Sequence, residues 1–230
     1  MPNEWDAVAD TYAASPQVDW FDDFFERHLP HDLTGKRVLD LGCGHGWFAA
    51  KLHDRGAHVH AVDGSERLLE IAERDHPGPA YEHVDLSTTG IDGTYDIVVA
   101  LMVLMDVERL DAITPTVTGT FVATLLHPSF WNQRTVDDET IGNGGYRRVT
   151  GYLDHETWTV ESFGGGDGRG HTHYHRPLQT YVDWIAARGL GVVELYEPPS
   201  AVYGGWRRPI PTRLGLAAKP LRLEPPELRP

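Results

Sequence analysis

A glycine-rich turn after the first strongly apolar segment constrains the fold of this chain more than any other feature. Residues Val38 to Leu41 predict a buried strand, glycines follow at positions 42, 44 and 46, and a helical pattern begins at Trp47. Because glycine has no Cβ, such a turn can adopt positive φ and let a ligand approach its backbone, beside the amides that open the next helix. A dinucleotide-binding turn has the spacing G-x-G-x-x-G, and its third glycine would fall on the bulky Trp47. The turn therefore predicts a site for a nucleotide-like ligand other than a dinucleotide.

The rest of the chain alternates between strand-like and helix-like patterns. Strands are predicted at 38–41, 58–62, 81–84, 96–101, 120–126, 191–196 and 213–218, and helices at 47–55, 66–74, 107–113 and 178–188. This order predicts an α/β, Rossmann-like, doubly wound sheet of seven mostly parallel strands, whose ligands bind beyond the carboxyl ends of the strands.

The length of 230 residues suits a single α/β domain with insertions. We divide it into an N-terminal helical cover (1–35), a ligand-binding core (36–127), an insertion (128–176), a C-terminal part of the sheet (177–219) and a tail (220–230). The insertion is too long for an ordinary connection. We expect it to be a β-rich substrate cover, with strand-like patches at 146–153 and 157–162 and a mobile tip at 164–168.

Composition narrows the class of partner. The formal net charge is −14, from 20 basic and 34 acidic residues, so binding to nucleic acid phosphates would begin against an unfavourable field. The single cysteine, Cys43, cannot form an internal disulfide, and no apolar run approaches the length of a membrane span. We therefore expect a cytoplasmic protein that acts on a small molecule, with no nucleic acid or membrane partner. The oligomeric state stays open.

Three acids occupy positions where the predicted sheet would present them to a ligand. Asp63 closes the second predicted strand, where a carboxylate can accept hydrogen bonds from both hydroxyls of a ribose. Asp40 precedes the glycines and is expected mainly to brace their turn, with a water-mediated hold on an amino group as a further role. Asp85 follows the third predicted strand.

The pattern D-x-G-x-G-x-G from Asp40 to Gly46, with the acids that follow, resembles class I S-adenosylmethionine (SAM) dependent methyltransferases, in their small-molecule bacterial-type subgroup. The resemblance runs from about Trp5 to Ala218. It implies SAM as cofactor, S-adenosylhomocysteine as product, and an adenine contact for Asp85. Related quinone or carbon methyltransferases often carry a histidine pair after strand four, where this chain has Met105-Asp106, so their substrates do not transfer. The cofactor-binding residues that the motifs and the resemblance imply are Tyr12, Asp40, Gly42, Cys43, Gly44, Gly46, Asp63, Gly64, Ser65, Asp85, Leu86, Ala100, Leu101 and Met105.

The resemblance implies methyl transfer to an oxygen or nitrogen of a small organic molecule, with secondary metabolites among the candidates. An oxygen acceptor must lose its proton, so His127 and His175 are the candidate bases, since an imidazole titrates near working pH. Phe130, Trp131 and Tyr174 are expected to line the substrate pocket. Two alternatives stay open: a SAM-binding protein that transfers no methyl group, and a nicotinamide-dependent oxidoreductase.

Three histidines alternate at positions 171, 173 and 175, so in an extended segment their side chains would share one face. That spacing is compatible with metal ligation. No cysteine lies nearby, and transfer from a sulfonium needs no metal unless the substrate is catechol-like. We therefore assign no metal ligand from the sequence, and whether this segment binds a metal stays open.

Overall fold

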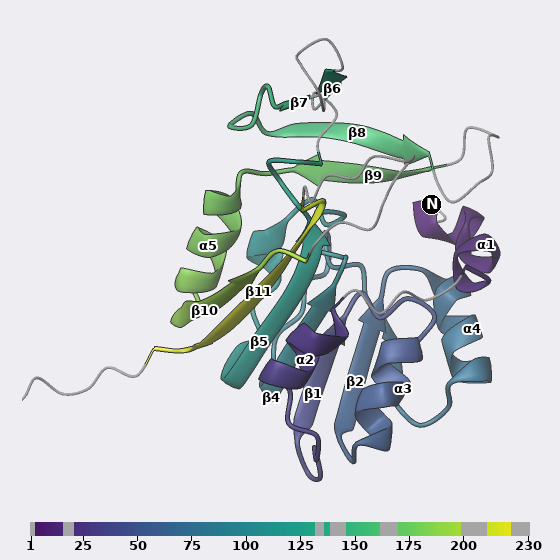
Figure 1. Cartoon of the computed structure of the whole chain (residues 1–230). Helices are drawn as coiled ribbons and strands as arrows, with labels where there is room; N and C mark the ends of the chain where they lie inside the picture. Colours follow the sequence, from purple (N-terminus) through teal and green to yellow (C-terminus); the bar gives the residue numbers. More distant parts are fainter. Residues whose placement is uncertain are drawn as a thin grey trace, which may run out of the picture.

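The computed structural model describes residues 3–15, 21–131, 136–138, 146–161, 170–198 and 211–221 (Figure 1). The expected mobile tip at 164–168 and residues 222–230 of the tail lie outside these ranges. Among the described residues, the search for a helix both long and apolar enough to cross a membrane finds none.

A seven-stranded sheet forms the centre of the molecule, in the order β10-β11-β5-β4-β1-β2-β3. Its strands are β1 (Arg37–Leu41), β2 (His58–Asp63), β3 (Ala80–His83), β4 (Thr94–Leu101), β5 (Thr116–Leu126), β10 (Leu190–Tyr196) and β11 (Arg213–Pro220). Strand β11 runs antiparallel to both its neighbours, and the other pairings are parallel. The predicted seven-stranded, mostly parallel sheet is confirmed.

Helices cover both faces of the sheet because its central strands are apolar on both sides. Leu39 of β1 and Val98 of β4 lie in a core cluster with Trp184 of α5, whereas Val38 and Val99 lie in a second cluster with residues of α2 and α3. Such two-sided burial explains the unbroken apolar runs in the sequence. The helices are η1 (Glu4–Ala7), α1 (Ala9–Ala13), α2 (Asp22–His28), α3 (Trp47–Asp54), α4 (Glu66–Asp75), η2 (Leu110–Ala112) and α5 (Leu178–Ala186).

The helix predicted at 107–113 is wrong, because only the short 3-10 turn η2 forms there. The buried Arg176 guanidinium donates hydrogen bonds to the carbonyls of Val107 at 2.6 Å and Glu108 at 2.7 Å. These are carbonyls that an α-helix starting at this point would use for its own first bonds. A tertiary contact from a distant residue thus outweighs the local helical pattern.

The insertion contains two hairpins, one of which covers the carboxyl ends of the strands (Figure 1). The covering hairpin pairs β8 (Glu156–Glu161) with β9 (Gly170–His175), and the other pairs β6 (Val136–Asp138) with β7 (Tyr146–Arg148). The patch predicted at 146–153 is therefore extended only in its first three residues. Strand β9 is tied to the loop after β4 by the Tyr174 amide, which donates to the Met105 carbonyl at 2.7 Å.

Candidate functional site

The three glycines of the turn between β1 and α3 all adopt positive φ, but only one has an open side. A Cβ on Gly42 would lie 2.3 Å from Val103 Cγ2, and one on Gly46 would lie 2.5 Å from the Tyr81 hydroxyl. A Cβ on Gly44 would meet nothing nearer than a Tyr12 ring carbon at 3.4 Å. Gly42 and Gly46 therefore allow close packing within the protein, and Gly44 faces the space beneath Tyr12.

Asp63 at the end of β2 holds the glycine turn in place. The Gly44 amide donates to its Oδ2 at 2.8 Å, and the Ser65 amide donates to its Oδ1 at 2.9 Å. Burial raises the pKa of Asp63, while these two amide bonds oppose that shift. We expected Asp40 to be the brace of the turn, and the structure gives that role to Asp63. Each carboxylate oxygen of Asp63 still has a second lone pair for a ligand hydroxyl.

Asp40 is 1% exposed, and its Oδ2 has no hydrogen-bond partner among the residues that the structure describes. Burial, and then the charge of Asp63, raise the pKa of Asp40 to about 8. A buried carboxylate without a partner is costly, and a cationic ligand group such as an ammonium would relieve that cost. The end of β1 thus presents an acceptor that the protein itself leaves unsatisfied.

The N-terminal segment closes over this end of the sheet. Asn3 Nδ2 donates to the Gly64 carbonyl at 2.8 Å, and Ser65 Oγ donates to Asp6 Oδ1 at 2.6 Å. Ser65 also caps α4, because its Oγ accepts from the Leu68 amide at 3.1 Å. These contacts use Gly64 and Ser65 to anchor the cover that carries Tyr12.

Tyr12 lies close to the acids of the site. Its pKa is raised to about 12, first by burial and then by the charges of Asp63, Asp106 and Asp40. Its ring also packs against that of His45 in the glycine turn, with centroids 5.6 Å apart, so α1 lies over the turn that follows β1.

Most of the remaining predicted cofactor residues have apolar side chains that pack in the protein. Asp85 is exposed, and its Oδ1 accepts from the Ser87 amide at 2.9 Å. The side chain of Leu101 is half-buried against the core cluster that includes Val38. Four others have side chains packed in the hydrophobic core: Cys43, Leu86, Ala100 and Met105.

The two candidate bases are both engaged in hydrogen bonds. His127 Nδ1 accepts from the Ser129 amide at 3.1 Å, so its Nε2 carries the proton and donates to Glu197 at 2.9 Å. His175 Nε2 donates to the Tyr152 carbonyl at 3.0 Å. Burial lowers the pKa of both histidines. This geometry leaves the His127 ring without a lone pair for a substrate proton.

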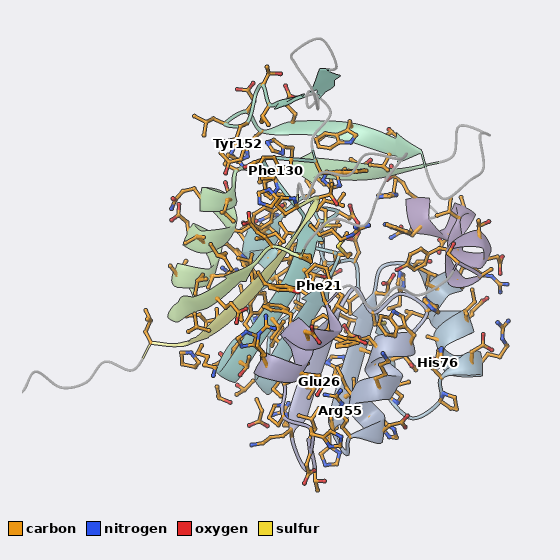
Figure 2. All side chains as sticks on the ribbon, in the orientation of Figure 1. Phe21, Glu26, Arg55, His76, Phe130 and Tyr152 are labelled. Carbon is orange, nitrogen blue, oxygen red and sulfur yellow. The ribbon has the colours of Figure 1, made fainter. Side chains whose placement is uncertain are left out.

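The residues predicted to line a substrate pocket lie in the segment after β5 and on β9. Phe130 packs on the ring of His127 with centroids 4.6 Å apart. Figure 2 shows both Phe130 and Tyr152 close to the β8–β9 hairpin. Trp131 is half-buried, and its amide donates to the His127 carbonyl at 2.8 Å. The ring of Tyr174 lies 5.5 Å from the Arg176 guanidinium carbon.

Three further polar side chains converge beneath the hairpin, and we did not select them as site residues from the sequence. Asp106 Oδ1 lies 3.4 Å from His173 Nδ1 and 3.6 Å from His171 Nε2. The expectation that the alternating histidines share one face is confirmed, because positions 171, 173 and 175 are all buried in β9. Burial raises the pKa of Asp106 to about 7 and lowers that of His173 to about 4. The histidine spacing was visible in the sequence, but nothing local paired it with Asp106.

Comparison with known proteins gives the same family as the motifs. A family model described as a methyltransferase domain matches residues 38–118. The chain is 44% identical over 77 residues to the magnesium-protoporphyrin O-methyltransferase of Rhodobacter capsulatus, a match that covers 32% of this chain and 34% of that enzyme. It is 38% identical over 85 residues to the ubiquinone biosynthesis O-methyltransferase of Methylocella silvestris, covering 34% and 33%. The chain thus spans about a third of the length of these curated relatives.

Solved structures match over most of the chain. A Listeria monocytogenes protein described as a SAM-dependent methyltransferase is 27% identical, with a TM-score of 0.71 over 88% of this chain and 98% of that one. A SAM-dependent methyltransferase from Mesorhizobium loti is 24% identical, with a TM-score of 0.68 over 87% and 97%. At 24% identity, the likeness to the Mesorhizobium loti protein shows a shared fold and nothing more.

The residues at the sheet edge fit the cofactor of this family. SAM carries an ammonium, which suits the unsatisfied Asp40, and two ribose hydroxyls, which suit the remaining lone pairs of Asp63. The ring of Tyr12, which lies next to Gly44, would favour its sulfonium, because aromatic faces attract cations. Residues 38–118 thus match a methyltransferase domain, and the chain has the fold of SAM-dependent methyltransferases.

Proposed function

We propose that this protein transfers the methyl group of SAM to an oxygen or nitrogen of a small organic molecule. Oxygen is favoured, because the curated relatives that match residues of the core are named as O-methyltransferases. The nicotinamide-dependent alternative is set aside, because Trp47 replaces the third glycine of a dinucleotide turn and the matching relatives are methyltransferases.

The unsatisfied Asp40 carboxylate is the observation that carries the proposal. It sits at the end of β1, next to the one glycine of the turn with an open side, and an ammonium would complete its hydrogen bonds. Asp63 would hold the ribose while keeping the turn in shape. When bound, SAM supplies a methyl group already activated by its sulfonium, so the protein need not activate it further.

The chain's own residues then have two tasks, to orient the acceptor and to exclude water. The β8–β9 hairpin and the N-terminal segment provide the cover, and they are joined where the Thr172 amide donates to Glu4 Oε2 at 2.6 Å. A base from His127 would have to give up its bond to Glu197, so we propose that alignment contributes more than proton abstraction by that residue.

A binding and transfer experiment tests the proposal. SAM at about 100 times its dissociation constant should stabilise the protein by about 2.7 kcal/mol in thermal unfolding, and NAD should have no effect. The Asp40→Asn variant should lose most of the SAM response, whereas the matched control Asp54→Asn, which alters an exposed acid at the end of α3, should keep it.

Transfer is then measured with methyl-labelled SAM and a panel of phenols, carboxylic acids and amines. Label in an acceptor supports the proposal. A response to NAD in place of SAM overturns it, and so does tight SAM binding with no transfer to any acceptor, which would indicate a binding protein.

A further inference from the structure

We propose that Asp106, His171 and His173 form a binding site for a divalent transition-metal ion of the zinc type, beneath the β8–β9 hairpin. One ligand atom from each of the three side chains lies within 4.8 Å of the others. Two of the ligands come from alternate positions of β9, and the third comes from the loop after β4.

The distances fit metal ligation better than hydrogen bonding. Asp106 Oδ1 is 3.4 Å from His173 Nδ1 and 3.6 Å from His171 Nε2, beyond the usual hydrogen-bond limit of about 3.2 Å. An ion bound tetrahedrally at about 2.0–2.1 Å from each donor would place the donors roughly 3.3–3.4 Å apart. The two printed separations are therefore close to those of donors that share one ion, and the third pair of ligand atoms also lies within 4.8 Å.

Unsatisfied buried atoms support the same conclusion. Asp106 Oδ1 and His173 Nδ1 are both buried, and neither has a hydrogen-bond partner within the described part of the chain. Buried polar groups are usually paired, and an exception calls for a cause. A single cation between the two atoms would satisfy both, because a carboxylate and a neutral imidazole each offer it a lone pair.

The surrounding structure holds the ligands in fixed orientations. Trp5 stacks on the ring of His171 with centroids 4.2 Å apart, and Trp158 packs on that of His173 at 4.6 Å. Arg176 donates to the carbonyls of Leu104, Val107 and Glu108, and so fixes the loop that carries Asp106. Locked rotamers and a braced loop are what a preorganised metal site requires.

The donor set selects the kind of metal. Two imidazoles and one carboxylate suit zinc and neighbouring first-row ions, whereas magnesium and calcium prefer oxygen ligands. Three protein ligands leave a coordination position for an outside group, as in catalytic rather than structural zinc sites. Because Trp5 of the N-terminal segment stacks on His171, the site lies where this segment and the hairpin meet.

We assign the open coordination position to a hydroxyl of the methyl acceptor. This assignment rests on the proposed function. A metal-bound hydroxyl loses its proton to the solvent near neutral pH. The resulting oxygen would use its electron pair to form a bond to the methyl carbon as the carbon–sulfur bond of SAM breaks. The acceptor class that fits is an alcohol or phenol with a second oxygen able to bind the same ion.

Metal binding is tested on the full chain, without SAM. After chelator treatment and dialysis, zinc is titrated by calorimetry and cobalt by visible absorption, since a cobalt ion with nitrogen and oxygen ligands is coloured. We expect one equivalent of tight binding. The Asp106→Asn and His173→Gln variants should bind at least about 100-fold more weakly, beyond the roughly 10- to 100-fold loss seen when a residue only orients a ligand.

His175→Gln is the matched control, because His175 is buried on the same face of β9 but donates to the Tyr152 carbonyl. It should bind zinc as the unmodified chain does. Equal binding by all variants, or no stoichiometric binding, overturns the site; circular dichroism establishes that each variant is folded.

Transfer assays separate this inference from the proposed function. If the chelated protein methylates hydroxyl acceptors as fast as the metal-loaded one, the metal does not activate the acceptor and that step is overturned. A rate that rises at least about tenfold with zinc and is lost in His173→Gln supports it. Absence of methyl transfer with stoichiometric zinc binding would contradict the proposed function and leave the metal site standing.

Discussion

The cofactor side and the cover side of this molecule are built in opposite ways. On the cofactor side, Asp40, Gly44 and Asp63 come from two adjacent strands and their turns, within a short stretch of sequence. On the cover side, Glu4 contacts Thr172, which lies 168 residues away. The cofactor side is therefore specified by local sequence, and the cover side exists only when distant segments meet.

The difference extends to how each side satisfies its polar groups. Asp63 pairs with two backbone amides of its own neighbourhood, so the turn is complete before a ligand arrives. Asp106 and His173 are buried together without hydrogen-bond partners among the residues described. On the cofactor side the Asp63 carboxylate and the two amides are therefore paired without a ligand, whereas the cluster on the cover side needs an additional group to satisfy it. Four tests can break or sharpen this comparison.

The largest effect is expected for Asp63→Ala, on the cofactor side. The variant leaves the amides of Gly44 and Ser65 without acceptors. Each buried unpaired amide costs about 1–3 kcal/mol, so the free energy of unfolding should fall by about 2–6 kcal/mol and SAM affinity by about 100-fold. Chemical denaturation and calorimetry measure the two changes. Asp63→Asn keeps one acceptor oxygen, so its stability and SAM affinity should lie between those of the unmodified protein and Asp63→Ala. Unchanged SAM affinity in Asp63→Ala would contradict the bracing role.

A paired glycine test distinguishes packing from ligand space. Gly42→Ala places a methyl group 2.3 Å from Val103 Cγ2 at φ 64°, whereas Gly44→Ala at φ 57° meets only the Tyr12 ring at 3.4 Å. Gly42→Ala should destabilise the fold by about 2–4 kcal/mol, and Gly44→Ala by about 1–2 kcal/mol.

Val103→Ala should recover part of the loss in Gly42→Ala, because it removes the clash but not the strained φ. Gly44→Ala should instead weaken SAM binding more than its stability loss implies. Equal stability losses at the two positions, with no rescue by Val103→Ala, would refute the assignment of Gly42 to internal packing.

Because of Asp40, we expect the stability of the unliganded protein and its affinity for SAM to change in opposite directions with pH. Its folded-state pKa of about 8 lies above the ordinary value of 3.8, so without ligand the stability falls as pH rises between these values. An ammonium ligand needs the ionised form, so SAM affinity should rise towards pH 8, by at most about tenfold per pH unit. Asp40→Asn should remove both trends, weaken SAM binding at pH 8 and stabilise the unliganded protein there. Thermal unfolding and calorimetry at pH 6, 7 and 8 check this; a wild-type affinity independent of pH would argue against an Asp40–ammonium contact.

The smallest effect is expected for Thr172→Val, on the cover side. It removes the hydrogen bond from Thr172 Oγ1 to Glu4 Oε1, which is exposed and 2.9 Å long, but keeps the backbone bond. Stability should change by about 0.5–1 kcal/mol, and the acceptor KM should rise a few-fold while SAM affinity stays within about twofold. A loss of SAM affinity as large as that of the acceptor would show that the two sides are energetically coupled, against the comparison drawn above.

Much of the fold could be predicted because its signals are short in sequence. Apolar runs located the central strands, and the helix predicted at 66–74 forms as α4, with Ser65 as its N-cap. The failures have a common cause in contacts that form only when the chain is folded. Arg176 suppresses the helix after β4, and it is also the residue that fixes the loop of Asp106. Asp63 replaces Asp40 as the brace because the parallel register of β1 and β2 brings it to the Gly44 amide.

By itself the sequence determined the sheet, the glycine turn, the positions of the acids at the strand ends and the resemblance to methyltransferases, because each depends on residues close together in the chain. Only the tertiary structure decided which acid stays unsatisfied, which histidines have partners, and that His171 and His173 face Asp106. The physical reason is that burial and hydrogen-bond saturation are properties of packed neighbours. No local pattern encodes whether a distant carbonyl or amide will arrive to satisfy a given side chain.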